Sequence, residues 1–290
     1  MPASARADTV GSLLRPTYLR EARQGRREGR VTEAELRAAE DRAVRQAIAL
    51  QEAAGLDVIN DGELRRASWI VTTAATSGHK AIAADPNEPY WFSLWKGPEV
   101  APPIVVNPPA RPYVTERIRE AHDLAKTEYA FLKANAHTRT KFTIPAPSWH
   151  RVYWHPMHSR AAYPSAEDYL RDMRDYIRGV LAQIMAMGCD YVQLDAPNYG
   201  MFHCDAQARA FFASQGRDLT AERAFDVEID NSVFEGISGV TRALHVCRGN
   251  NAGGRWVANG GYAVSRVARI FPSSAPSQEG VVKGTTARVV

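Results

Sequence analysis

The sequence predicts an α/β protein with a TIM-type (β/α)8 barrel, and three observations support this prediction. Long helical segments alternate along the chain with short apolar runs. The apolar runs lack the alternation of half-exposed strands, which is typical of parallel strands buried on both faces. The length of 290 residues fits one such barrel. A doubly wound open sheet, which shows the same succession of elements, is the second choice.

The helical segments carry clear start and stop signals. Thr32 and Glu35 form a capping box, and the alanine- and leucine-rich segment behind them ends at Gly55. A second long helix is expected to start near Thr115, and a third is capped by Ser165. The predicted helices are residues 31–55, 115–136, 165–188 and 219–237, and the predicted strands are residues 56–61, 141–148, 189–197 and 241–247.

The composition favours a globular intracellular protein. The net charge of +4 comes from 36 Lys and Arg residues interleaved with 32 Asp and Glu residues, which is typical of a solvated surface and not of a nucleic-acid-binding tract. Three cysteines spread over the chain make no disulfide framework. No apolar run reaches the roughly 20 residues that span a bilayer. We therefore expect a cytoplasmic protein that binds neither nucleic acid nor membranes.

The domain organisation is expected to be simple. One barrel domain covers residues 1–270, with a Pro- and Trp-rich excursion near residues 85–113. Residues 271–290 are rich in Ser, Pro, Gly and Thr and show no further alternation of strand and helix. The sequence therefore predicts an irregular tail after the barrel.

Polar side chains follow three of the predicted strands, at the point where each strand ends. The carboxyl ends of parallel strands meet at one edge of the sheet, where ligands bind in α/β folds. Each side chain taken alone is equally well interpreted as a helix cap or a turn residue. Their coincidence at three strand ends favours a site. The side chains are Asp61 and Glu63, Asp195 and Asn198, and His245 and Cys247.

His245 and Cys247 form the most specific of these pairs. Successive side chains of a strand point to opposite faces, so these two lie on the same side. An imidazole and a thiolate are typical zinc ligands, but catalytic zinc generally has three protein ligands. Three further side chains are candidates for the missing ligand, and no spacing decides among them. They are His203, Cys204 and Glu279.

The loop after the strand at residues 141–145 and the N-terminal segment add three candidates. His150 is interpreted as a substrate contact or a general acid, and plain loop structure is the alternative. Trp149 could stack on a flat substrate ring or simply pack in the loop. Arg15 is a candidate for binding a carboxylate or sulfonate, because a guanidinium meets such groups with two hydrogen bonds. It is equally plausible as a surface arginine.

Four motifs in order resemble the catalytic barrel of cobalamin-independent methionine synthase and its stand-alone relatives. They are "DTVGSLLRP", "GLDVINDGELRR", "GCDYVQLDAP", and "HVCRGN" followed by "GRWVANGGY". The resemblance extends from about Asp8 to about Arg269. In the third motif, Ala196 stands where the family has a second acidic residue.

The resemblance implies a zinc-dependent S-methyltransferase of methionine biosynthesis. Zn²⁺ would be held by His245 and Cys247, and the amino-acid thiol by Ser12, Glu63 and Asp195. The metal would lower the pKa of the thiol, and the thiolate would attack the methyl group of a methylated folate. The partners are therefore a small thiol such as homocysteine and a methyl or alkyl donor.

The family continues for about two further barrel units, which supply a glutamate and a second cysteine to the zinc. After Ile270 this pattern does not return, so we expect a barrel that lacks its last two β/α units. Its open edges would need cover from a homodimer, from the tail, or from partial disorder. Two alternatives remain for the function. One is a zinc-dependent thiol alkyltransferase that acts on an epoxide, similar to coenzyme M transferases, and the other is an inactive remnant.

Overall fold

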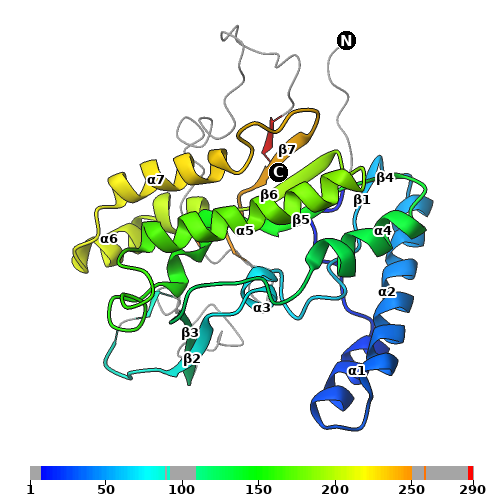
Figure 1. Cartoon of the computed structure of the whole chain (residues 1–290), viewed down its shortest axis with the longest axis horizontal. Helices are drawn as coiled ribbons and strands as arrows, with labels where there is room; N and C mark the ends of the chain where they lie inside the picture. Colours follow the sequence, from blue (N-terminus) through cyan, green and yellow to red (C-terminus); the bar gives the residue numbers. More distant parts are fainter. Residues whose placement is uncertain (1–7, 89, 92–108, 250–257, 259–286, 290) are drawn as a thin grey trace, which may run out of the picture.

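The computed structural model describes residues 8–88, 90–91, 109–249, 258 and 287–289. Figure 1 shows a mixed α/β arrangement in which helix α5 (Ala166–Ala186) runs across a parallel sheet. Helices α1 (Thr17–Arg27) and α2 (Glu33–Ala53) pack against each other at one end of the molecule. The α/β class predicted from the sequence is confirmed.

The strands pair in parallel, as the apolar runs predict. The sheet has the order β5 (Phe142–Pro145), β6 (Tyr191–Asp195), β7 (Thr241–His245) and β8 (Ala287–Val289). Strand β1 (Val58–Ile59) pairs in parallel with β4 (Arg139–Thr140). Only Lys141 separates β4 from β5, and its amide donates to the carbonyl oxygen of Ile59 at 2.9 Å. The parallel pairing therefore continues from β1 through β4 and β5 to β8.

Two of the predicted helix starts are confirmed in atomic detail. The Thr32 hydroxyl accepts from the Glu35 amide at the start of α2, and Ser165 and Asp168 form the same capping box at the start of α5. The other helical elements are α3 (Thr72–Ala75), the π-helix η2 (Ala125–Tyr129), α4 (Ala130–Asn135), the 3-10 helix η3 (Pro147–Tyr153), the π-helix η4 (Tyr199–His203), α6 (Ala206–Ser214) and α7 (Leu219–Ser232).

The helix predicted to start near Thr115 begins later, so this prediction is wrong for residues 115–123. The Thr115 amide donates to the carbonyl oxygen of Gly78, and the Ala121 amide to that of Ala75, both at 2.8 Å. These bonds hold the segment extended against its neighbours. The Asp123 side chain then accepts from the Lys126 amide at 2.8 Å, and the helical backbone follows.

The ends of the predicted excursion form a hairpin outside the parallel sheet. Strand β2 (His79–Ala83) pairs antiparallel with β3 (Ala110–Val114). The middle of the excursion, residues 92–108, lies outside the described residues. Strand β8 falls within the predicted irregular tail, and it pairs in parallel with β7. The other tail residues, and with them the predicted loss of two barrel units, lie outside the described part of the chain.

The two faces of the central strands differ in polarity. One face carries apolar side chains such as Ile144, Leu194 and Leu244, and these belong to the same hydrophobic core as the buried side of α5. The opposite face carries Gln193 and Asp195 from β6, which are also buried. The strands are therefore buried on both faces, as predicted, but one of these faces holds polar groups.

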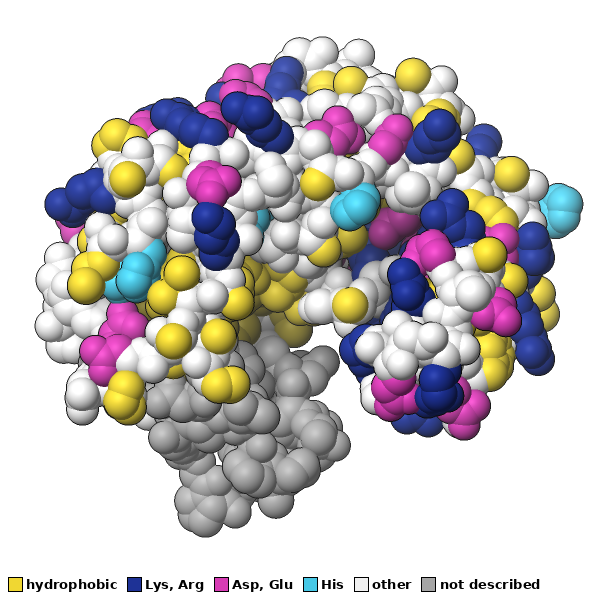
Figure 2. Space-filling model, turned by 60° about the horizontal axis from the view of Figure 1, so that its bottom comes forward, with side chains coloured by type: hydrophobic (Ala, Val, Ile, Leu, Met, Phe, Trp, Pro, Cys, Tyr) yellow, Lys and Arg dark blue, Asp and Glu magenta, His cyan; other side chains and the backbone are white. Residues whose placement is uncertain are grey.

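Charged side chains of both signs lie on the described surface. Figure 2 shows Lys and Arg side chains interspersed with Asp and Glu side chains over the face turned forward. Within the described residues, no helix is long and apolar enough to cross a lipid bilayer.

A candidate active site at the carboxyl ends of the strands

The first part of the site joins the N-terminal segment to the loop after β1. The Ser12 hydroxyl donates to Oε2 of Glu63, and the Thr143 hydroxyl donates to Oε1 at 2.7 Å. Glu63 has a φ of 54°, the left-handed region that non-glycine residues rarely adopt. Such strained backbone is most often found at functional sites, where the surroundings enforce it. Gly11 allows the close approach, because a Cβ there would lie 2.5 Å from Glu63 Oε1.

Arg66 pairs with the Glu63 carboxylate in a buried ion-pair cluster. Its Nη1 lies 3.4 Å from Glu63 Oε1, and its Nη2 lies 2.8 Å from Glu128 Oε2. Burial alone would lower the pKa of Arg66, but the two carboxylates outweigh it and raise the pKa. Asp61 contributes the turn, since its Oδ1 accepts from the Glu63 amide at 2.9 Å. Burial raises the pKa of Asp61.

The second part of the site lies on the neighbouring strands β6 and β7. Their register places Asp195 opposite His245, and His245 Nδ1 donates to Asp195 Oδ1 at 3.0 Å. The Gly249 amide donates to the Cys247 sulfur at 3.2 Å. Burial alone would lower the pKa of His245 and raise the pKa of Cys247. Nevertheless Asp195 and Cys247 raise the pKa of His245 to about 9, and His245 and the Gly249 amide lower the pKa of Cys247.

The imidazole of His245 and the thiol of Cys247 fit zinc in type, and they make two candidate ligands among the described residues. A zinc-binding histidine usually donates its other ring nitrogen to a carboxylate, as His245 does to Asp195. Among the described residues, no group of three or more His, Cys, Asp or Glu side chains could hold a metal ion. His203, one candidate for a third ligand, donates to Asp226 at 2.9 Å instead. Glu279 lies outside the described residues.

The two parts lie side by side on the polar face of the sheet. Thr143, which holds Glu63, is the register partner of Gln193, and Gln193 Nε2 donates to Asp195 Oδ1 at 2.8 Å. The structure thus brings together five of the residues predicted from the sequence. They are Ser12, Glu63, Asp195, His245 and Cys247.

Arg15 lies beside this group, but its visible contacts are with the backbone. Nη1 donates to the carbonyl oxygen of Leu13 at 2.9 Å, and Nη2 donates to that of Glu63 at 3.1 Å. These bonds brace the turn that carries Ser12. Arg15 as a substrate ligand remains a prediction.

His150 is buried and bonded on both sides of its ring. Nδ1 donates to the carbonyl oxygen of Ala146 at 3.0 Å, so Nε2 accepts from the Thr72 hydroxyl at 2.5 Å. Burial lowers the pKa of His150 to about 3. A neutral ring with both nitrogens occupied is typical of a structural histidine, and a general acid needs a proton to give. The geometry therefore favours the structural alternative.

Trp149 belongs to a cluster of aromatic side chains. It stacks on Phe202 with ring centroids 5.9 Å apart and an interplanar angle of 13°, and it contacts Trp69 at 5.1 Å. The side chain is buried. These contacts correspond to the loop-packing interpretation, and stacking on a substrate ring stays a prediction.

Asn198 takes part in a separate buried network that the sequence reasoning missed. Its Nδ2 donates to the Ser148 hydroxyl at 3.0 Å and lies 3.3 Å from Asp226 Oδ2. Ser148 also binds Asp230, whose pKa rises to about 7, chiefly because the carboxyl is buried. The two aspartates lie on α7, whose sequence resembles an ordinary surface helix. No spacing in the sequence could have indicated them.

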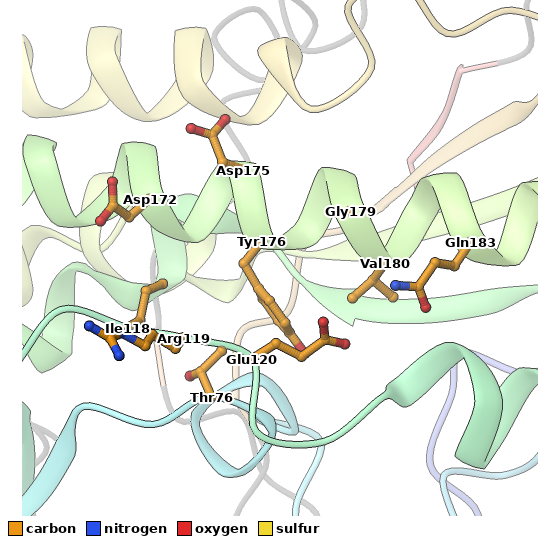
Figure 3. Close-up of a pocket in the computed structure, with 10 residues that line it drawn as sticks. All are labelled: Thr76, Ile118, Arg119, Glu120, Asp172, Asp175, Tyr176, Gly179, Val180 and Gln183. Carbon is orange, nitrogen blue, oxygen red and sulfur yellow. The ribbon is translucent and has the colours of Figure 1, made fainter.

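A pocket of about 320 Å³ lies elsewhere, between α5 and the extended segment before η2. Figure 3 shows Tyr176 pointing from α5 towards Glu120 and Thr76. None of the predicted site residues lines this pocket. The Tyr176 hydroxyl is buried and has no hydrogen-bond partner among the described residues.

We expect Tyr176→Phe to leave the protein as stable as before or more stable by about 1 kcal/mol, since a buried polar group without a partner costs free energy. Tyr129→Phe is the matched control, because that hydroxyl bonds to Thr140 at 3.0 Å and its loss should destabilise the protein. Urea unfolding of both variants measures the difference. Equal destabilisation by the two changes would contradict the expectation.

Part of the chain matches a known protein family in sequence. Residues 6–122 match the family described as "Cobalamin-independent synthase, Catalytic domain", and this segment includes Ser12 and Glu63. Over this segment the chain is similar to the catalytic domain of the cobalamin-independent methionine synthases. The resemblance seen in the four motifs is thereby confirmed.

Relatives of this family cover most of the chain. The uncharacterised protein YxjH of Bacillus subtilis is 29% identical over 262 residues, which is 90% of this chain and 66% of YxjH. A protein named methionine synthase from Sulfurisphaera tokodaii is 26% identical over 190 residues, or 65% of this chain and 50% of its own length. The chain therefore spans about two thirds or less of these relatives.

The fold is also similar to that of a known protein. The structure of the putative vitamin-B12-independent methionine synthase from Listeria monocytogenes superposes with a TM-score of 0.61 at 22% identity, covering 87% of this chain and 68% of that protein. This likeness concerns the fold alone, which is similar to the barrel-type fold of that protein.

Proposed function

We propose that this chain is a zinc-dependent S-methyltransferase that transfers a methyl group from a methylated folate to an amino-acid thiol such as homocysteine. The observation that supports the proposal most strongly is the Asp195–His245–Cys247 group on the same sheet face as the Ser12–Glu63–Thr143 group. The relatives that carry the name methionine synthase point in the same direction. The epoxide-directed enzyme and the inactive remnant gain no support from the comparisons.

The two carboxylates would bind the ammonium group of the amino-acid thiol. Glu63 is held by Ser12 and Thr143, and Asp195 by His245, so both are oriented before the substrate arrives. Preorganised charges of this kind bind without the cost of reorganisation. The carboxylates fix the amino-acid end of the substrate and direct its sulfur towards Cys247.

His245 and Cys247 would hold the zinc ion. When bound, zinc lowers the pKa of a coordinated thiol, so that a thiolate is available at neutral pH. Asp195 keeps the His245 ring in the tautomer that presents Nε2 for binding, because its carboxylate accepts from Nδ1. A homodimer and cytoplasmic localisation stay predictions of the sequence.

The proposal is tested by metal analysis together with product analysis. Purified protein is expected to contain zinc in a ratio near one, and to form methionine from homocysteine and methyltetrahydrofolate. Cys247→Ser should remove most of the zinc, because a thiolate is a far better zinc ligand than a hydroxyl. Cys189→Ser is the matched control, since this thiol is buried, donates to the carbonyl oxygen of Tyr191 and lies at the opposite end of β6 from Asp195.

Two results would contradict the proposal. One is a zinc content that Cys247→Ser does not change. The other is the absence of methionine when zinc-loaded protein is supplied with both substrates. Product formation from coenzyme M and an epoxide in their place would support the alkyltransferase alternative.

A further inference from the structure

A buried row of polar side chains leads into the site from the amino-terminal side of the sheet. Lys141 and Gln193 are fully buried on the same face as Asp195. Lys141 Nζ donates to Gln193 Oε1 at 2.8 Å, and Gln193 Nε2 donates to Asp195 Oδ1 at 2.8 Å. Neither Lys141 nor Gln193 is among the strand-end residues predicted from the sequence.

The Gln193 amide is completely used by its neighbours. One hydrogen of Nε2 is directed to Asp195, and the other to the carbonyl oxygen of Val10 at 2.8 Å. Lysine can only donate, so the Gln193 oxygen must face Lys141 and the NH2 group must face the two acceptors. The orientation of the amide is therefore fixed by Lys141.

Lys141 itself is held in place by charge. Its Nζ lies 3.3 Å from Asp8 Oδ2, and the Tyr191 hydroxyl donates to the same oxygen at 3.3 Å. A buried ammonium without a partner is costly, so this ion pair is the reason that Lys141 can remain charged inside the sheet. The pair also attaches Asp8 to the link between β4 and β5.

These bonds act on the site at two points. Asp195 Oδ1 accepts from both Gln193 and His245, so these two bonds together set the orientation of the carboxylate. Val10 is two residues from Ser12, so its bond to Gln193 fixes the turn that carries the Ser12 hydroxyl. One amide thus sets the distance between the two halves of the proposed substrate site.

We infer that Gln193, oriented by Lys141, is a positioning residue that sets Asp195 and the Ser12 turn to receive the ammonium group of the amino-acid thiol. This inference rests on the proposed function, because it takes the amino-acid thiol as the ligand. It assigns no contact between Gln193 and the substrate.

The test compares two thiols by isothermal titration calorimetry on the zinc-loaded protein. Homocysteine carries the amino group, and 4-mercaptobutanoate has the same chain without it. Gln193→Met should weaken homocysteine binding roughly tenfold, which corresponds to the loss of about one hydrogen bond's net contribution. Binding of 4-mercaptobutanoate should not change. A purely structural role would weaken both thiols alike.

Gln193→Glu sharpens the test. It keeps an oxygen for Lys141 but turns a second oxygen towards Asp195 and the Val10 carbonyl, so repulsion replaces two hydrogen bonds. We expect homocysteine binding to weaken more than in Gln193→Met. Lys141→Met should show the same selective effect if the methionine variant at position 193 does not fold. Gln183→Met, on α5, is the control.

The outcomes separate the two proposals. If the wild-type protein binds homocysteine but forms no methionine, the proposed reaction fails, while the inference is still decided by the ratio of the two affinities. Equal weakening of both thiols, or no change in either, would overturn the inference alone. If homocysteine does not bind to the wild-type protein, both are wrong.

Discussion

Arg66→Met is expected to lower the free energy of unfolding by about 3–5 kcal/mol, because it leaves buried carboxylates without their cation. Arg66 is 2% exposed, and its guanidinium contacts Glu128 through Nε and Nη2 and Glu63 through Nη1. Nη2 also donates to the Thr143 carbonyl oxygen at 2.7 Å. Urea unfolding followed by circular dichroism measures the loss.

Arg117→Met is the matched control for this prediction. Arg117 forms an ion pair with Asp172 at 2.9 Å, but its side chain is 55% exposed. Pairs of this kind contribute about 1 kcal/mol or less, since water screens both charges. If the two variants lose similar stability, the buried cluster does not carry the energy that its geometry indicates. Arg66→Met with Glu128→Met should recover part of the loss, because one unpaired charge is removed.

Glu63→Gln is expected to lower kcat/KM for methyl transfer to homocysteine roughly 10- to 100-fold, because hydrogen bonds to charged groups contribute about 1.5–3 kcal/mol. The Glu63 carboxylate is contacted by three donors, which are the Ser12 hydroxyl, the Thr143 hydroxyl and the Arg66 guanidinium. A glutamine must turn its NH2 group towards one of these donors. It also lacks the charge that would bind an ammonium group. Steady-state kinetics with homocysteine as the varied substrate measures the effect.

Glu40→Gln serves as the comparison for Glu63→Gln. Glu40 lies on α2 and pairs with Arg23 at 3.3 Å and with Arg65 at 3.9 Å, and neither partner is a predicted site residue. We expect it to keep wild-type kinetics, with at most a small change in stability. Unchanged kcat/KM in Glu63→Gln would remove Glu63 from the proposed substrate site. A loss of zinc in this variant would show that the change acts through the metal site instead.

Local signals in the sequence determined the starts of two long helices and the identity of the strands. Thr32 with Glu35 and Ser165 with Asp168 bond within one helical turn, so no distant residue is needed to form these caps. The apolar runs likewise predict parallel strands, because such strands are buried on both faces wherever they lie in the sheet. The sidedness of His245 and Cys247 follows from the period of a strand alone.

Long-range contacts decided what local signals could not. Residues 115–121 have helical composition, but backbone bonds to Gly78 and Ala75 hold them extended. His150 follows a strand end, as a site residue would. Its Nε2 nevertheless accepts a hydrogen bond from the hydroxyl of Thr72, which is distant in the sequence. The periodicity of a helix or strand predicts on which face of the element a residue lies. It does not predict which other segment packs against that face.

The same distinction holds for the site. The sequence by itself determined that acidic, imidazole and thiol side chains occur at several strand ends, because strand boundaries and side-chain alternation are local properties. Only the tertiary structure decided that Asp195 lies beside His245, and that Arg66, Gln193 and Lys141 are buried with partners. The physical reason is that register and burial of charge depend on pairing between segments far apart in the chain, and a polar residue shows no sign of its future partner in its own neighbourhood.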